Sequence, residues 1–158
     1  MNTVMSIAIA LHVLAAVIWV GGMFFAHQVL RPVAADLLDP PLRQPLWVGV
    51  FKRFFPWVWV AIIILYLSGY WMIFGSPKYS GFGTAGVHIH LMHGLALIMT
   101  AIFFYVYFVP FQRLKKAVAE QAWPVGKGHI DRIRIMVGIN TIIGFITIAV
   151  AVGGVYLL

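Results

Sequence analysis

The chain has no cysteine and little charge of either sign. Without cysteine it has no disulfide bridges, thiolate metal sites or cysteine-ligated iron–sulfur clusters. Only 9% of the 158 residues are charged, whereas a soluble domain carries charge at roughly a quarter of its positions. Because 63% of the residues are hydrophobic, the composition is that of an integral membrane protein.

Acidic residues are the scarcest charged class, with four Asp and Glu against eleven Lys and Arg and a net charge of +7. A basic chain can bind nucleic acid, but these charges stand beside apolar segments, where they set the orientation in the membrane. We therefore expect no nucleic-acid partner. The N-terminus lacks the basic region and the cleavage site of a signal peptide, so we expect the first apolar segment to be a retained helix.

Four apolar segments are each long enough to cross a bilayer, which takes about 20 residues. None shows the alternation of a strand, so all four are expected to be helices. Short connections favour an antiparallel up-down-up-down bundle, and the predicted fold is an all-α integral membrane protein with a single domain over residues 1–158. The predicted spans are residues 6–30, 54–74, 86–109 and 133–157.

Basic residues predict the orientation of this bundle. The connections at residues 31–53 and 110–132 hold most of the Lys and Arg residues, whereas the second connection has only Lys78. Loops rich in Lys and Arg stay in the cytoplasm. We therefore expect these two connections to be cytoplasmic and both termini to lie outside, in a bacterial-type inner membrane.

Histidines deep in apolar sequence are the first candidate site, because ionisable side chains in a membrane are costly and mark function. With Thr3 and Thr84 as helix caps, His12 and His93 each follow nine residues later, roughly 13 Å below the outer surface. His90 shares a face with His93. Helices one and three lie diagonally, on the order of 11–14 Å apart, a gap that suits haem between two axial histidines.

Copper is a second interpretation of the same region. Imidazoles beside methionine thioethers suit Cu(I), and methionine is also an ordinary filler of apolar helices. The copper ligands would come from His12, His88, His90, His93 and Met92. A third interpretation is structural, because a lone membrane histidine can simply hydrogen-bond a neighbouring helix and His88 suits an interface.

Other polar and aromatic residues in the spans allow both structural and functional roles. Trp19 follows His12 by seven residues on the same face, where it either packs in the core or walls a cofactor pocket. His27, near the inner end of the first helix, is within reach of headgroups or of an inner site. Polar groups in the fourth helix are expected to bond between helices or to support a ligand, namely Asn140, Thr141 and Thr147.

The first helix carries a family resemblance. The stretch from Leu11 to Gly22 (LHVLAAVIWVGG), followed by Leu30-Arg31-Pro32, resembles the first helix of copper resistance D (CopD) domains. Lys52-Arg53-Phe54 at the start of the second helix and Ser68-Gly69 near its end continue the likeness. The resemblance implies a role in copper transport or copper tolerance across the inner membrane.

The chain is also similar in size and topology to the HemJ-type protoporphyrinogen oxidases, four-helix proteins that bind haem b. The shared residues are Leu11-His12, Trp19 and Gly22, and the resemblance makes His12 a haem ligand. The His-x-Lys motif of that family reads His88-Ile89-His90 here, so His90 replaces the lysine. The family arginine late in helix one falls at Gln28, which departs from the pattern of the oxidases.

The leading hypothesis from the sequence is an inner-membrane b-type haem protein. His12 with either His93 or His90 would be the axial ligands, Trp19 would line the pocket, and the role would be electron transfer or another redox reaction. Because bis-histidine iron has no open position, electron transfer is favoured over catalysis at the metal, although an oxidoreductase activity stays open. Membrane lipid and a quinone or protein redox partner are expected, and a homo-oligomer stays open. The alternatives are a CopD-type copper-binding or copper-transport protein and a HemJ-like protoporphyrinogen IX oxidase.

Overall fold

The first membrane helix is one continuous rod from Thr3 to Leu37 that changes its winding twice. The computed structural model describes residues 3–75 and 81–157. The π-helical turns in this rod are uncommon elements that recur at functional sites. In chain order the rod consists of α1 (Thr3–Ala16), the π-helix η1 (Val17–Gly21), α2 (Gly22–Phe24), the π-helix η2 (Phe25–Leu30) and α3 (Arg31–Leu37).

The rest of the described chain is also helical. It comprises α4 (Pro40–Phe74), the short 3₁₀-helix η3 (Phe82–Thr84), α5 (Val87–Phe108), α6 (Pro110–Ala119) and α7 (Trp123–Leu157). Within the described residues, four helices are long and apolar enough to cross a membrane, with α5 and α6 counted as one. The predicted all-α, four-span membrane fold is therefore confirmed.

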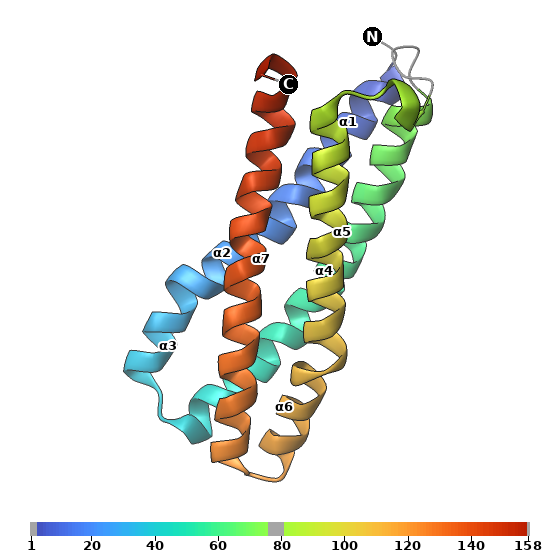
Figure 1. Cartoon of the computed structure of the whole chain (residues 1–158). Coiled ribbons are helices and arrows are strands. Elements are labelled where there is room, and N and C mark those ends of the chain that lie inside the picture. The colour runs from blue at the N-terminus through green and yellow to red at the C-terminus, as the bar shows by residue number, and fades with distance from the viewer. Residues whose placement is uncertain (1–2, 76–80, 158) are drawn as a thin grey trace.

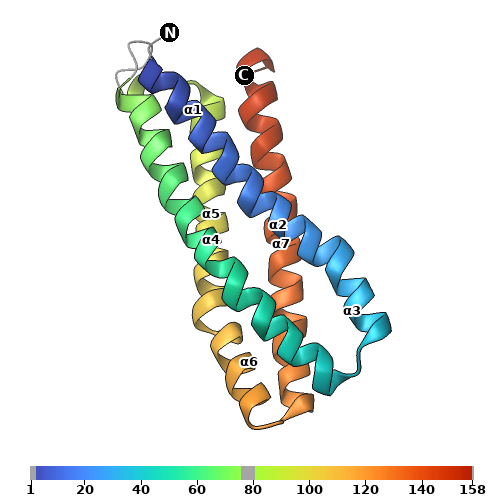
Figure 2. The same cartoon turned by 180° about the vertical axis from the view of Figure 1, so that it is seen from behind.

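The helices alternate in direction, so α1 begins and α7 ends at the same end of the bundle (Figure 1). The first helix crosses the bundle obliquely, packing on α4 and, through its middle part, on α7 (Figure 2). The α5–α6 helix packs on α7 from the other side. The first and third spans thus lie on opposite sides of the bundle, as an up-down-up-down order requires.

The first connection is much shorter than the predicted 31–53. Between α3 and α4, only Leu38 and Asp39 lie outside a helix. Pro40 opens α4, where the missing N–H of proline is tolerated. A helix of the length of α4 spans about 52 Å and so projects beyond a hydrocarbon core of about 30 Å. Hydropathy detects only the part inside the core, which is why the polar ends of the helices read as loops.

Two kinds of contact hold the bundle together. Glycines let helices approach closely: a Cβ on Gly22 would collide with the ring of Phe54. Between α4 and the α5–α6 helix, aromatic rings fill the space instead. The ring of Phe55 lies 5.5 Å from that of Phe103 and 4.9 Å from that of Phe111. The bundle is therefore tight at its glycine contacts and wide at its aromatic layer.

Charge is confined to the end of the bundle where α3 meets α4 and α6 meets α7. Ten of the eleven Lys and Arg residues and all four acidic residues belong to the segment 31–53 or to 113–134. Figure 1 shows both segments at the end opposite to the start of α1. The other end of each helix has no Lys, Arg, Asp or Glu among the described residues. This distribution is the basis for placing the charged end in the cytoplasm.

Candidate functional site

His12 lies against α4, not in an open space between helices. Its Nδ1 is 2.9 Å from Ser68 Oγ, and the Ser68 hydroxyl in turn donates to the carbonyl of Ile64. Because the hydroxyl has one proton, the imidazole donates from Nδ1 and keeps a free lone pair on Nε2. Gly69 permits this approach, since a Cβ there would stand 3.3 Å from the ring. His12 thus joins α1 to α4.

His90 and His93 share an aromatic environment. Both rings contact Phe82, with ring centroids 5.8 Å and 5.1 Å away. The ring of His93 also lies against Tyr66 and Tyr70 of α4. His90 is exposed and His93 is half-buried. These two histidines therefore occupy the apolar end of the bundle, on the side of α5 that faces α4.

The described contacts do not pair His12 with His90 or His93. His12 touches α4 at Ser68 and Gly69, whereas His93 touches it at two tyrosines, Tyr66 and Tyr70, that lie one turn apart on a different face. The prediction that Thr84 caps the third span is wrong, because α5 begins at Val87 with Gly86 as its N-cap. Among residues 3–75 and 81–157, no group of three or more His, Asp or Glu side chains could hold a metal.

His88 points to the opposite side of α5 from His90, toward α7. A Cβ on Gly154 would stand 2.5 Å from His88 Cβ, so the two helices nearly touch at this point. The Nδ1 atom of His88 is buried and has no hydrogen-bond partner among the described residues. Met92, one turn along α5, is half-buried. His88 is thus half-buried, and its shielded Nδ1 is unused.

Deeper in the bundle, two methionine sulfurs from other helices contact α7: Met99 of α5 and Met23 of α2. Thr147 places its hydroxyl 3.9 Å from the sulfur of Met99, which is 3% exposed. Asn140 donates from Nδ2 to the sulfur of Met23, 3.6 Å away, and to the carbonyl of Met99, 3.3 Å away. The amide oxygen of Asn140 is buried without a partner among the described residues. The expectation of bonds between helices is confirmed for Asn140. It is wrong for Thr141, whose hydroxyl donates to Val137 within α7, and the Thr147 hydroxyl likewise donates to Ile143 and only contacts the Met99 sulfur.

The α7 residues at these three contacts are evenly spaced. Asn140, Thr147 and Gly154 follow one another at intervals of seven residues, so they share one face and stand about 10 Å apart along the axis. Asn140 and Thr147 each face a methionine sulfur on another helix, and Gly154 faces the Cβ of His88, whose ring lies toward Gly86. We call these three donors the donor row: His88 opposite Gly154, Met99 opposite Thr147, and Met23 opposite Asn140.

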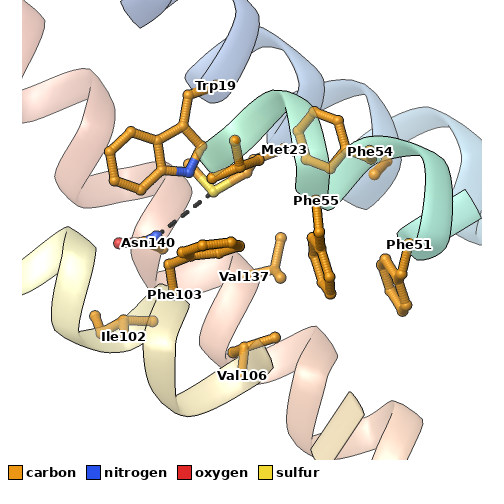
Figure 3. Close-up of a pocket in the computed structure, with 12 residues that line it drawn as sticks. Trp19, Met23, Phe51, Phe54, Phe55, Ile102, Phe103, Val106, Val137 and Asn140 are labelled. Carbon is orange, nitrogen blue, oxygen red and sulfur yellow. Dashed lines mark hydrogen bonds between the residues drawn. The ribbon is translucent and has the colours of Figure 1, made fainter. Parts of the chain in front are cut away.

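A pocket adjoins the inner end of the donor row. Its empty space, including the part open to the surroundings, is about 390 Å³, and its lining includes Trp19, Met23 and Asn140 together with aromatic side chains of α4 and α5 (Figure 3). Trp19 is 3% exposed and its indole meets the ring of Phe103 edge-on at 6.3 Å. Trp19 and Met23 of the first membrane helix therefore line this pocket together with Asn140 of α7, and His12 is not among its lining residues.

Met23 and Met99 were not among the candidate ligands taken from the sequence. The sequence contains one signal for Met23, because it follows Trp19 by four residues and so shares its helix face. It also contains a signal for the partner wall, because Asn140 is an isolated amide in an apolar run. Nothing in the sequence shows that these two faces meet.

Comparison with known proteins adds one finding. The family model described as copper resistance protein D (CopD) matches residues 48–153, which includes most of α4 and all of α5 and α6. Met99, Asn140 and Thr147 lie inside the matched range, whereas His12, Trp19 and Met23 lie before it. Searches of curated proteins and of solved structures found no match.

Proposed function

The chain belongs to the copper resistance protein D (CopD) family and spans a membrane several times, and we propose that it binds copper as Cu(I) between its helices. The observation that carries the proposal is the donor row along α7. Copper would be the bound or transported substrate of the protein, not a resident cofactor. Transport across the membrane, in support of copper tolerance, is the role that fits such a row.

The chemistry of the donors supports Cu(I) over harder ions. Thioether and imidazole ligands select Cu(I) when thiolates are absent, as they are here. Carboxylates, which Ca²⁺ and Mg²⁺ require, do not occur in the described membrane-spanning core. A monovalent cation also brings the smallest charge into an apolar interior.

The unused polar atoms support a ligand at the same places. A buried acceptor without a partner is unusual and costs about 1–3 kcal/mol, so each one calls for an explanation. Two such atoms lie along the donor row. Nδ1 of His88 is at one end, and at the other end is Oδ1 of Asn140, the α7 residue that faces Met23. Both are atoms that a cation would satisfy. The weak hydrogen bond on the Met23 sulfur leaves that sulfur available as a ligand.

The spacing of the row suits passage through the membrane as well as storage. Donors at intervals of about 10 Å give several weak sites along one interface instead of one strong site. Conduction requires that kind of binding, since an ion must leave each site as readily as it enters. His88 would meet the ion first, because it is the histidine nearest the start of α5 at the apolar end of the bundle.

Haem b is the competing proposal for His12. It needs a second axial histidine, His90 or His93, to share a space with the free Nε2 of His12. The contacts of these histidines lie on different faces of α4 and give that reading less support than the donor row gives copper. Electron transfer and porphyrinogen oxidation both require haem, so these two functions have the same weaker support.

Copper binding is best tested on the purified protein in detergent, by competition for Cu(I) against a colorimetric chelator. The wild type is expected to retain Cu(I). The double variant Met23→Leu, Met99→Leu is expected to lose at least about tenfold in affinity, because leucine keeps the volume and removes both thioethers. Met136→Leu, on α7 but outside the row, is the matched control and is expected to bind as the wild type does.

A second pair of variants separates binding from folding. Asn140→Leu removes the unsatisfied amide oxygen and is expected to keep the fold, because a non-polar residue of similar size replaces a group with an unmade hydrogen bond. It is nevertheless expected to weaken Cu(I) binding. His88→Ala is likewise expected to weaken binding more than His90→Ala does. Unchanged affinity in the methionine double variant would contradict the proposed site.

A further inference from the structure

A second pocket lies at the charged end of the bundle, apart from the donor row. It lies between η2 and α3 on one side and α4 and α7 on the other, and its empty space, including the part open to the surroundings, is about 330 Å³. Its floor is apolar and includes Trp47, Phe51 and Ile133. Its polar lining consists of three groups that carry or can accept positive charge: His27, Arg31 and Arg134.

The positive charge of this pocket is poorly compensated. In the described part of the chain, no carboxylate lies within ion-pair distance of Arg31, whose Nε donates to the carbonyl of His27 at 3.3 Å. Arg134 has one partner, Asp131, at 3.8 Å, and both side chains of that pair are 43% exposed. A pair so exposed contributes little and can be exchanged for another anion.

His27 adds an unused nitrogen to the same lining. Its ring lies on Gly138 of α7, where a Cβ would stand 2.9 Å from Nε2. Its Nδ1 is buried and has no hydrogen-bond partner among the described residues. The ring is therefore held in place by the close approach of the two helices, with one polar atom left for a ligand.

The depth of the pocket indicates what the ligand is. Arg31 follows directly after the first predicted span, residues 6–30, and Arg134 stands at the start of the last, so both guanidinium groups lie at the level of lipid headgroups. The apolar floor extends from there toward the hydrocarbon. Basic pockets between membrane helices recognise anionic headgroups, and guanidinium forks bind phosphate with two parallel hydrogen bonds.

We propose that this pocket binds one anionic phospholipid. The phosphate would lie against Arg31 and Arg134, a headgroup oxygen would reach His27, and the acyl chains would stay in the surrounding bilayer, because Trp47 and Phe51 are already buried by the protein. The position of both guanidinium groups at the headgroup level favours a lipid over a free phosphate ion. The site is independent of copper, since it shares no residue with the donor row.

The test is native mass spectrometry of the detergent-solubilised protein, titrated with phosphatidylglycerol or with phosphatidylcholine. The wild type is expected to retain one phosphatidylglycerol in preference to phosphatidylcholine. The variant Arg31→Gln, Arg134→Gln is expected to lose that preference, by about tenfold or more. The charge-preserving variant Arg31→Lys, Arg134→Lys is expected to recover part of it.

Two controls make the result decisive. Arg113→Gln, Lys115→Gln removes two cations from the same end of the bundle but outside the pocket, and is expected to bind lipid as the wild type does. Inorganic phosphate at millimolar concentration is expected not to displace the lipid. Equal binding of both lipids, equal losses in the two Gln variants, or displacement by phosphate would overturn the proposal. Circular dichroism of each variant checks that the helices are intact.

Discussion

Asn140 of the last helix donates a hydrogen bond to the sulfur of Met23 in the first helix, 3.6 Å away, while its own amide oxygen has no partner among the described residues. The amide also donates to the carbonyl of Met99, which ties α7 to α5, but neither contact satisfies the buried amide oxygen. Together with Met99 at Thr147 and His88 at Gly154, the contact with Met23 places donors at regular intervals along α7. These contacts are the basis of the copper proposal.

The orientation of the bundle is directly testable because the chain has no cysteine of its own. Lys127→Cys, at the charged end, is expected to react with a membrane-impermeant maleimide only after the cells are permeabilised. Gly83→Cys, at the other end, is expected to react in intact cells. Both positions are exposed. The reverse pattern of labelling would place the charged end outside the cell.

A pair of glycines near the start of α7 predicts opposite effects of the same substitution. A Cβ on Gly126 would collide with Gln44 Oε1, and Gln44 is buried and donates to the carbonyl of Trp123 at 2.7 Å. Gly126→Ala is expected to lower the free energy of unfolding by about 1–3 kcal/mol. Gly128→Ala meets nothing within 4 Å and is expected to raise it by up to about 1 kcal/mol. Unfolding in a denaturing detergent measures both.

The contact between His12 and Ser68 is expected to stabilise the packing of α1 on α4. Ser68→Ala removes the partner of His12 Nδ1 and is expected to lower the free energy of unfolding by about 1 kcal/mol. Thr141→Val is the control, because its hydroxyl bonds within its own helix, to Val137. If both variants unfold alike, the His12 contact contributes nothing between the helices.

Haem binding is tested by the visible spectrum. We expect protein expressed with an ample supply of haem, and then purified, to show no Soret band. A Soret band that persists in the wild type and disappears in the His12→Ala, His93→Ala double variant would establish the haem reading instead. The spectrum of the copper-loaded protein does not interfere, because Cu(I) has a filled d shell and no visible absorption of its own.

The sequence was sufficient for the fold because membrane helices are marked by length and apolarity alone. The spans and their alternating order follow from length and apolarity. The inward bond of Asn140 follows because it is an isolated amide in an apolar run. The ends of the helices do not, since residues 40–53 and 123–132 are helical but polar enough to read as loops. Hydropathy reports the thickness of the membrane, not the length of the helix.

The site could be predicted only in part, because helices that are apolar all round do not show which face meets a neighbour. Residue type gave His88 and Met92 as copper candidates and the helical period gave Trp19 as a candidate pocket wall, and these stay predictions. Met23 and Met99 became candidates only from the structure, because they contact Asn140 and Thr147. The π-helical turns at Val17–Gly21 and Phe25–Leu30 change the direction of side chains in the first helix, which a fixed 3.6-residue period does not reproduce.

The most direct test of the copper proposal is X-ray absorption spectroscopy of the purified protein loaded with one equivalent of Cu(I). We predict sulfur in the first coordination shell of the copper in the wild type and in Met136→Leu, and its loss in the Met23→Leu, Met99→Leu double variant. A copper environment of nitrogen and oxygen alone in the wild type, or sulfur that persists in the double variant, would contradict the account.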